Sequence, residues 1–358
     1  DGTVSIGANA GKNITSGIGN VSVGRGALAN EDDGDYNTAI GYQALTTQTG
    51  TSGTVANTAV GYSAGLDITT GTQNTLMGYL AGHNLTVAGH NTALGSEALA
   101  SEDVGDFTVA IGYRTGYYQN SDSNNEDAAN TLVGTGAGFY NITGTKNTLI
   151  GRQAGLGVIN ESNSDNVAIG YRALYGVTTG HENTVVGYEA AYSLTSADNN
   201  TIIGRQAGYN LTTSRYNVLI GDQAGYNLVE SSTNNDNVMI GVSAGYAGDN
   251  NWPQATDNVY VGRSAVHHLD DGYANVAIGK EAGFSDSGGG NASHKSVWIG
   301  HQAGYSVTDS YYGVMIGYQA GYAVTNGEAN TIIGYQAGKE ITTKDRNTII
   351  GYEAVYSS

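Results

Sequence analysis

The sequence predicts an all-β fold, a parallel β-solenoid (a β-roll) of about 20 coils, on three observations. A glycine step recurs along essentially the whole chain, its commonest period is 17 residues, and β-branched or other aliphatic residues precede each glycine. A unit this short cannot bury a core of its own, so each coil must stack on its neighbours. We therefore expect residues 1–358 to form a single repeat domain, a fragment of a longer fibrous chain.

The recurring glycine is the anchor of each unit, and positions are numbered from it here, so that position −1 is the residue before it. Glycine permits turn angles that a Cβ atom would forbid. Intervals longer than 17 residues run from 19 to 22, and the extra residues fall in polar segments such as 119–129, 248–257 and 285–295. Such placement predicts a loop outside the strands. Representative anchors are Gly41, Gly61, Gly78, Gly151, Gly204 and Gly334.

Two further positions are nearly invariant. Asparagine stands at position −4 in sixteen of twenty units, and alanine stands at position +3 in nineteen. Stacked coils place equivalent residues about 4.8 Å apart. Small alanine then fits where layers approach closely, and asparagine side chains can form hydrogen bonds from coil to coil. The predicted asparagine ladder includes Asn37, Asn57, Asn74 and Asn347.

A strand is expected just before the glycine, because β-branched residues at a spacing of two are typical of a strand with one buried face. Position −1 is always aliphatic and position −3 is always threonine or valine, so we predict that both face the interior. Position −2 then points outward as an apolar stripe, which marks an interaction surface. We expect a parallel homotrimer, or else a long loop, to cover Leu76, Leu149, Ile202, Leu219, Met239, Trp298, Met315 and Ile332.

Composition excludes several classes of protein. With 55 glycines but one proline the chain is not collagen-like, and without cysteine it has neither disulfides nor thiolate metal sites. A net charge of −18 argues against nucleic-acid partners. The sequence contains no run of 18 apolar residues, so we do not expect direct membrane insertion. Residues 61–65 match a nucleophile-elbow string, but Ser63 fills a position where other units carry glutamine. We therefore expect that this chain is not an enzyme.

Tyrosine and acidic residues supply the candidate binding features. Tyrosines recur at positions +1 and +5, and stacked rings either form a platform for sugars or proteins or merely shield the edge of the roll. Acidic loops at 31–35, 102–106 and 122–127 offer oxygen ligands for calcium, although solubility explains them equally well; no other cofactor is expected. His267 and His268 beside Asp270 and Asp271 are interpreted as a solvated loop. The candidate ligand-binding residues are Tyr42, Tyr62, Tyr79, Tyr188, Tyr209, Tyr226, Tyr305 and Tyr322.

The motif Asn-Thr-Ala-Ile-Gly at residues 37–41, with its relatives at 166–170 and 275–279, resembles the head repeats of YadA-like trimeric autotransporter adhesins. Similar repeats occur in phage tail fibres. The resemblance implies a left-handed, trimeric parallel β-roll outside the cell, on a bacterial surface or a virion.

These observations together predict an extracellular fibre or adhesin segment that attaches to a host cell or surface through many weak, repeated contacts to glycan or protein. The first alternative is a self-assembling extracellular filament without a dedicated receptor. The second is an ice-binding solenoid, which needs an exposed threonine array, whereas threonine at position −3 is predicted to face the interior.

Overall fold

The computed structural model describes residues 2–50, 52–121, 127–228, 236–246, 255–267, 272–285 and 293–355, and none of these residues is helical. The fold is all-β, a parallel β-solenoid of about 19 turns with a repeat of about 17 residues, as predicted. The chain divides into two compact units, Asp1–Thr179 and Gly180–Ser358. The same coil recurs in both units.

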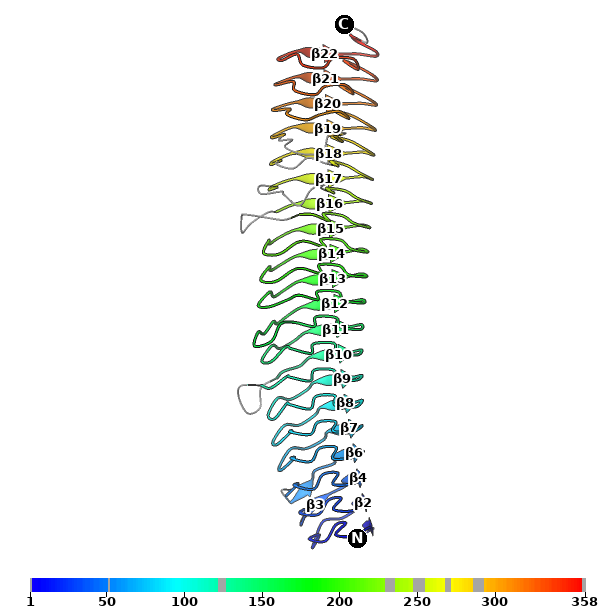
Figure 1. Cartoon of the computed structure of the whole chain (residues 1–358), viewed down its shortest axis with the longest axis vertical. Helices are drawn as coiled ribbons and strands as arrows, with labels where there is room; N and C mark the ends of the chain where they lie inside the picture. Colours follow the sequence, from blue (N-terminus) through cyan, green and yellow to red (C-terminus); the bar gives the residue numbers. More distant parts are fainter. Residues whose placement is uncertain are drawn as a thin grey trace. The chain divides into compact units, whose positions relative to one another are not determined.

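In the first unit each coil contributes one three-residue strand to a parallel sheet, and successive strands lie side by side (Figure 1). A small second sheet pairs β3 (Gly34–Asp35) with β5 (Gly53–Thr54). The strands of the main sheet are β1 (Val4–Ile6), β2 (Val21–Val23), β4 (Thr38–Ile40), β6 (Thr58–Val60), β7 (Thr75–Met77), β8 (Thr92–Leu94), β9 (Val109–Ile111), β10 (Thr131–Val133), β11 (Thr148–Ile150) and β12 (Val167–Ile169).

The second unit repeats this arrangement with ten strands, again one for each coil (Figure 1). They are β13 (Thr184–Val186), β14 (Thr201–Ile203), β15 (Val218–Ile220), β16 (Val238–Ile240), β17 (Val259–Val261), β18 (Val276–Ile278), β19 (Val297–Ile299), β20 (Val314–Ile316), β21 (Thr331–Ile333) and β22 (Thr348–Ile350).

Equivalent positions pair with one another at every described junction between neighbouring strands. Ala59 of β6, for example, pairs with Leu76 of β7, and both residues are at position −2. The same positions pair where the interval is longer: Leu219 of β15 pairs with Met239 of β16, although 20 residues separate them. Extra residues therefore lie outside the strands, since an insertion within a strand would send its side chains to the opposite face. Much of the longest segments, 122–126, 247–254 and 286–292, lies outside the described residues.

The anchor glycine is required for two reasons. Gly41 has φ +138°, and a Cβ atom placed on it would lie 2.1 Å from the carbonyl oxygen of Gly61, the anchor of the next coil. In the second unit, a Cβ atom placed on Gly204 would lie 2.2 Å from the carbonyl oxygen of Gly221. A column of glycines thus lets successive backbones approach more closely than any side chain allows.

The asparagine ladder is confirmed, and it satisfies backbone groups as well as side chains. The backbone N–H of Asn74 donates to Oδ1 of Asn57 at 2.8 Å, and Asn74 Nδ2 donates to the Ala88 carbonyl oxygen at 2.9 Å. Near the end of the second unit, the Asn347 N–H donates to Asn330 Oδ1 at 2.9 Å. Each buried amide therefore links the strand of one coil to its neighbours, as burial of polar groups demands.

The predicted sidedness of the strands is wrong. Position −2, assigned above to an outward stripe, faces the core, and position −1 faces out. Alternation along a strand explains why: position −2 lies on the same face as the buried asparagine at position −4. The side chains predicted to point outward are instead fully buried within the single chain, each at 0% exposure. They belong to Leu76, Leu149, Ile202, Leu219, Met239, Trp298, Met315 and Ile332.

The outward face of the sheet carries positions −3 and −1, so this face is lined by threonine, valine and isoleucine. Its apolar side chains are substantially exposed: Ile40 at 39%, Met77 at 44%, Ile150 at 36% and Ile203 at 37%. We call positions −3 and −1 of the strands the outward strand face. An apolar surface thus exists in each unit, although on the side opposite to the one predicted.

Core volume is shared between positions −2 and +4. Most large residues at −2 have glycine at +4 of the same coil: a Cβ atom on Gly304 would lie 2.4 Å from a ring carbon of Trp298. The preceding coil also has glycine at +4, and a Cβ atom on that Gly283 would lie 2.6 Å from the Trp298 ring. The reverse combination occurs in four coils, where leucine at +4 accompanies a small residue at −2, so that the thin interior is filled at constant coil spacing. The four pairs are Leu28 with Ser22, Leu45 with Ala39, Leu99 with Ala93, and Leu174 with Ala168.

Candidate functional site: stacked aromatic columns

Tyrosines at position +1 stack in columns on the surface. Rings of Tyr42 and Tyr62 lie 5.1 Å apart between centroids, and those of Tyr62 and Tyr79 lie 5.4 Å apart. These three side chains are 37 to 50% exposed. Tyr188 occupies the same position in the second unit and is 49% exposed. The coil spacing is close to the stacking distance of aromatic rings, so one residue in each coil is enough to build the column.

Position +5 builds a longer column in the second unit, with eight rings stacked in sequence. Successive centroids are 4.8 to 5.5 Å apart, and the rings are tilted by 2 to 25°. Six of the eight rings are tyrosines at the predicted +5 position, and four of these six are among the candidate ligand-binding residues. The full column is Tyr192, Tyr209, Tyr226, Tyr246, His267, Phe284, Tyr305 and Tyr322.

Polar side chains at position +2 lie between the two columns. The Arg114 guanidinium carbon is 5.1 Å from the ring centroid of Tyr113, at +1, and 5.4 Å from that of Tyr117, at +5. Arg172 repeats this arrangement with the tyrosines of its own coil. Cation–π contacts thus connect the columns, a role for position +2 that sequence analysis missed.

Glutamines at position +2 form their own ladder in the second unit. Nε2 of Gln336 donates to Oε1 of Gln319, and Nε2 of Gln319 donates to Oε1 of Gln302, both at 2.8 Å. Gln302 in turn donates to Glu281 Oε2 at 2.8 Å. Because stacked amides repeat with the coils, the surface beside the rings offers hydrogen-bonding groups at regular intervals.

The hydroxyl of Tyr226 in the +5 column keeps its proton at neutral pH. Burial raises the pKa of Tyr226, and the neighbouring Tyr246 and Glu189 raise it further. Ionised oxygens stacked one coil apart would repel one another. The hydroxyls therefore offer donors and acceptors to a ligand, while the rings offer apolar surface.

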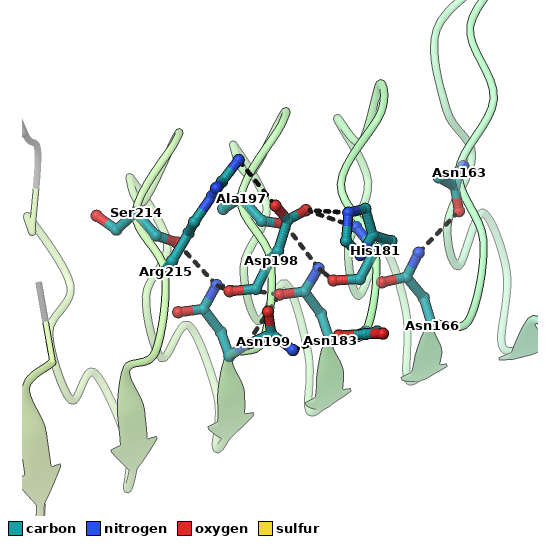
Figure 2. Close-up of polar contacts among 11 residues, drawn as sticks. Asn163, Asn166, His181, Asn183, Ala197, Asp198, Asn199, Ser214 and Arg215 are labelled. Carbon is teal, nitrogen blue, oxygen red and sulfur yellow. Dashed lines mark hydrogen bonds and ion pairs between the residues drawn. The ribbon is translucent and has the colours of Figure 1, made fainter. Parts of the chain in front are cut away.

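A separate ion cluster stabilises the second unit rather than offering a binding site. The Asp198 carboxylate, whose side chain is 6% exposed, lies between His181 and Arg215 (Figure 2). Arg215 Nη2 is 2.9 Å from Asp198 Oδ2, and the backbone N–H of His181 donates to Asp198 Oδ1 at 3.0 Å. A carboxylate this buried needs such partners.

The acidic loop at 31–35 brings three carboxylates together, with one oxygen each from Glu31, Asp32 and Asp33 within 4.8 Å of one another. Glu31 is fully buried and is already hydrogen-bonded: Oε1 accepts from the backbone N–H groups of Asp32, Asp33 and Gly34, and Oε2 accepts from Gly50. Desolvation and the neighbouring carboxylates raise the pKa of Asp33. Calcium binding here stays a prediction.

The other acidic and histidine-containing loops give less support to a cation site. Glu102 is buried and accepts N–H donors in the same way as Glu31. Residues 122–126 and 268–271 lie outside the described residues, so the pairing of His268 with Asp270 and Asp271 is not described. His267 itself stacks in the +5 column.

The structure brings the predicted tyrosines together and removes the predicted stripe from the surface. No protein-family model, curated protein or solved structure matches this chain. The resemblance to adhesin head repeats therefore stays a prediction based on short motifs. In the part of the chain that the structure describes, no helix has the length and apolar character to span a membrane.

Proposed function

We propose that this chain is a segment of an extracellular, homotrimeric attachment fibre built from left-handed coils, without enzymatic activity. The fibre presents repeated aromatic surfaces to a glycan or protein on a host cell or other surface. The observation that carries the proposal is the pair of exposed features in each unit, an apolar outward strand face and columns of stacked tyrosines.

The outward strand face supports self-association. Isoleucine and valine recur on it coil after coil, and exposed apolar surface of this regularity favours contact with another apolar surface. A second and third copy of the same chain present an identical face in the same register. Parallel association about a three-fold axis covers all three faces at once and leaves the aromatic columns outside.

Attachment then depends on repetition. Each stacked ring contributes a small apolar area with a hydroxyl, and three chains multiply the number of contacts. Many weak contacts on one scaffold give high avidity without a deep pocket. This mechanism suits a surface ligand that is itself repetitive, such as a polysaccharide.

The test is retention on an array of glycans and extracellular-matrix proteins. We expect the wild-type chain to be retained and the Tyr209→Ser, Tyr226→Ser double variant to lose retention. Tyr216→Ser, an exposed tyrosine outside the columns, is the matched control and should behave as wild type. Retention that is absent, or that is unchanged by the double variant, contradicts the proposal.

Ice binding becomes a second candidate, because threonine at position −3 lies on the outward strand face. The prediction that these threonines face the interior is wrong: Thr75 and Thr184 are exposed. Valine occupies the same position in half of the units, which interrupts the array and favours self-association instead. Thermal hysteresis of a chain kept monomeric by Ile150→Lys and Ile203→Lys would favour the ice-binding function over the trimer.

A further inference from the structure

One coil of the first unit departs from the repeat on the surface that bears the rings. Its anchor is Gly134, and its positions +1 and +2 are Thr135 and Gly136, whereas tyrosine and glutamine are the commonest residues at these two positions. Loss of those two side chains leaves a hollow of about 380 Å³ between the flanking coils. Small-molecule sites in proteins span about 300 to 1,000 Å³, so the hollow has the size of a binding site for a single sugar unit or a short oligosaccharide.

Aromatic and cationic side chains line this hollow. Rings come from Tyr113, Phe139, Tyr140 and Tyr175, and Arg152 enters from the following coil. Phe139 and Tyr140 are edge-on to each other at 4.7 Å, so the hollow has ring faces in two orientations. Ring faces are well suited to the apolar C–H faces of a sugar.

The charge of the hollow is opposite to that of the chain. Its lining includes Arg114 and Arg152 but no aspartate or glutamate, although the chain has a net charge of −18. Arg114 is neutralised in part by Glu97, whose Oε2 lies 2.5 Å from its Nε. Arg152 forms no ion pair within the described part of the chain and contacts only the Tyr171 ring by cation–π interaction, at 5.8 Å. Its guanidinium is therefore available to an anion.

We infer that this hollow binds an acidic saccharide, a sugar ring that carries a carboxylate. The rings take the apolar face of the sugar, and the Arg152 guanidinium takes the carboxylate, since its planar donors match that group in two parallel hydrogen bonds. A neutral sugar would leave the arginine unpaired. The inference rests on the proposed attachment function and assigns one specific ligand class to one coil.

Gly136→Gln is the decisive variant, because it restores the residue type usual at position +2 and fills the hollow. A Cβ atom on Gly136 would lie 3.8 Å from Gln153 Cγ, which is ordinary contact. Its φ of +65° resembles that of Gln153, +58°, so glutamine fits the backbone here. Gly26→Gln is the matched control: Gly26 is the other glycine at position +2, and its smaller hollow of about 180 Å³ has a single ring, Tyr42.

The experiment is isothermal titration calorimetry with trigalacturonate and its neutral methyl ester, and with sialyllactose and lactose. We expect at least one acidic member to bind with a Kd of about 1 mM or tighter, and its neutral partner at least tenfold more weakly. Gly136→Gln should abolish binding, Arg152→Gln should weaken it about tenfold or more, and Gly26→Gln should leave it unchanged.

Three results would overturn the inference: no binding of either acidic saccharide, equal binding of its neutral partner, or binding that survives Gly136→Gln. Circular dichroism of each variant confirms that the fold is retained. Failure here differs from failure of the attachment function, which is tested through Tyr209 and Tyr226 in the second unit.

Discussion

Replacing Leu149 by alanine should cost far more stability than replacing its neighbour Ile150, although both are apolar residues of β11. Leu149 is fully buried, and Cβ atoms added to Gly138 and Gly155 would lie 3.2 and 2.7 Å from its Cδ1. The paired strands fix the coil spacing, so the cavity cannot close. The loss should therefore be about 4 kcal/mol, towards the upper end of the range for leucine to alanine. Ile150 is 36% exposed, and in a single chain its loss should be about 1 kcal/mol.

The assay is urea unfolding followed by far-ultraviolet circular dichroism at several protein concentrations. The Leu149→Ala shift should not vary with concentration. The Ile150→Ala shift should grow with concentration, because only another chain can bury Ile150 further. If Ile150→Ala were as costly as Leu149→Ala at the lowest concentration, the assignment of the two strand faces would be refuted.

Three further outcomes are expected. Asn200→Ala should cost about 2 to 4 kcal/mol in urea unfolding, because it removes the acceptor of the Asn217 N–H and the donor to the Ser214 carbonyl oxygen; a loss below 0.5 kcal/mol would contradict the ladder's role. Tyr260→Phe should raise the free energy of unfolding by about 1 kcal/mol, because the buried hydroxyl lies near Asn275 without a hydrogen bond of good geometry; destabilisation would show that the hydroxyl is paired. The pKa of Asp33 is raised in the folded chain, so its ionisation opposes folding as pH rises through that pKa. Asp33→Asn should thus raise the urea midpoint at pH 7 and leave it unchanged at pH 3, and a stabilising effect at both pH values would rule out ionisation as the cause.

Much of the coil follows from the sequence because the anchor positions have one physical solution. A glycine every 17 residues, with asparagine four residues before it, specifies which backbones approach and which amides bridge them, as Gly41 and the Asn57–Asn74 contact illustrate. Parallel register follows directly, since equivalent residues must then stack.

The orientation of the strand did not follow, because residue type at positions −1 and −2 is misleading. Position −1 is uniformly aliphatic, which is typical of a core, whereas position −2 varies from alanine to tryptophan, which is typical of a surface. The variation arises in the core: Ala93 shares its layer with Leu99, and Leu76 shares its layer with Gly82. The signal that identifies the buried face is the asparagine at position −4, because residues two apart in a strand lie on the same face.

The candidate site was predictable only in part. Tyrosine periodicity predicted the columns, but the rings that complete the +5 column, His267 and Phe284, differ in type from the repeat. Nor did the sequence indicate that Gly136 opens a hollow, since a glycine is unremarkable among 55. Its significance depends on the side chains that flank it in space.

Sedimentation equilibrium of the purified chain tests the proposed trimer, in which two further copies cover the outward strand face. We expect a mass three times that of one chain, reduced to the mass of one chain by Ile150→Lys together with Ile203→Lys while circular dichroism is unchanged. A wild-type chain that sediments as a single copy up to the highest concentration would contradict it.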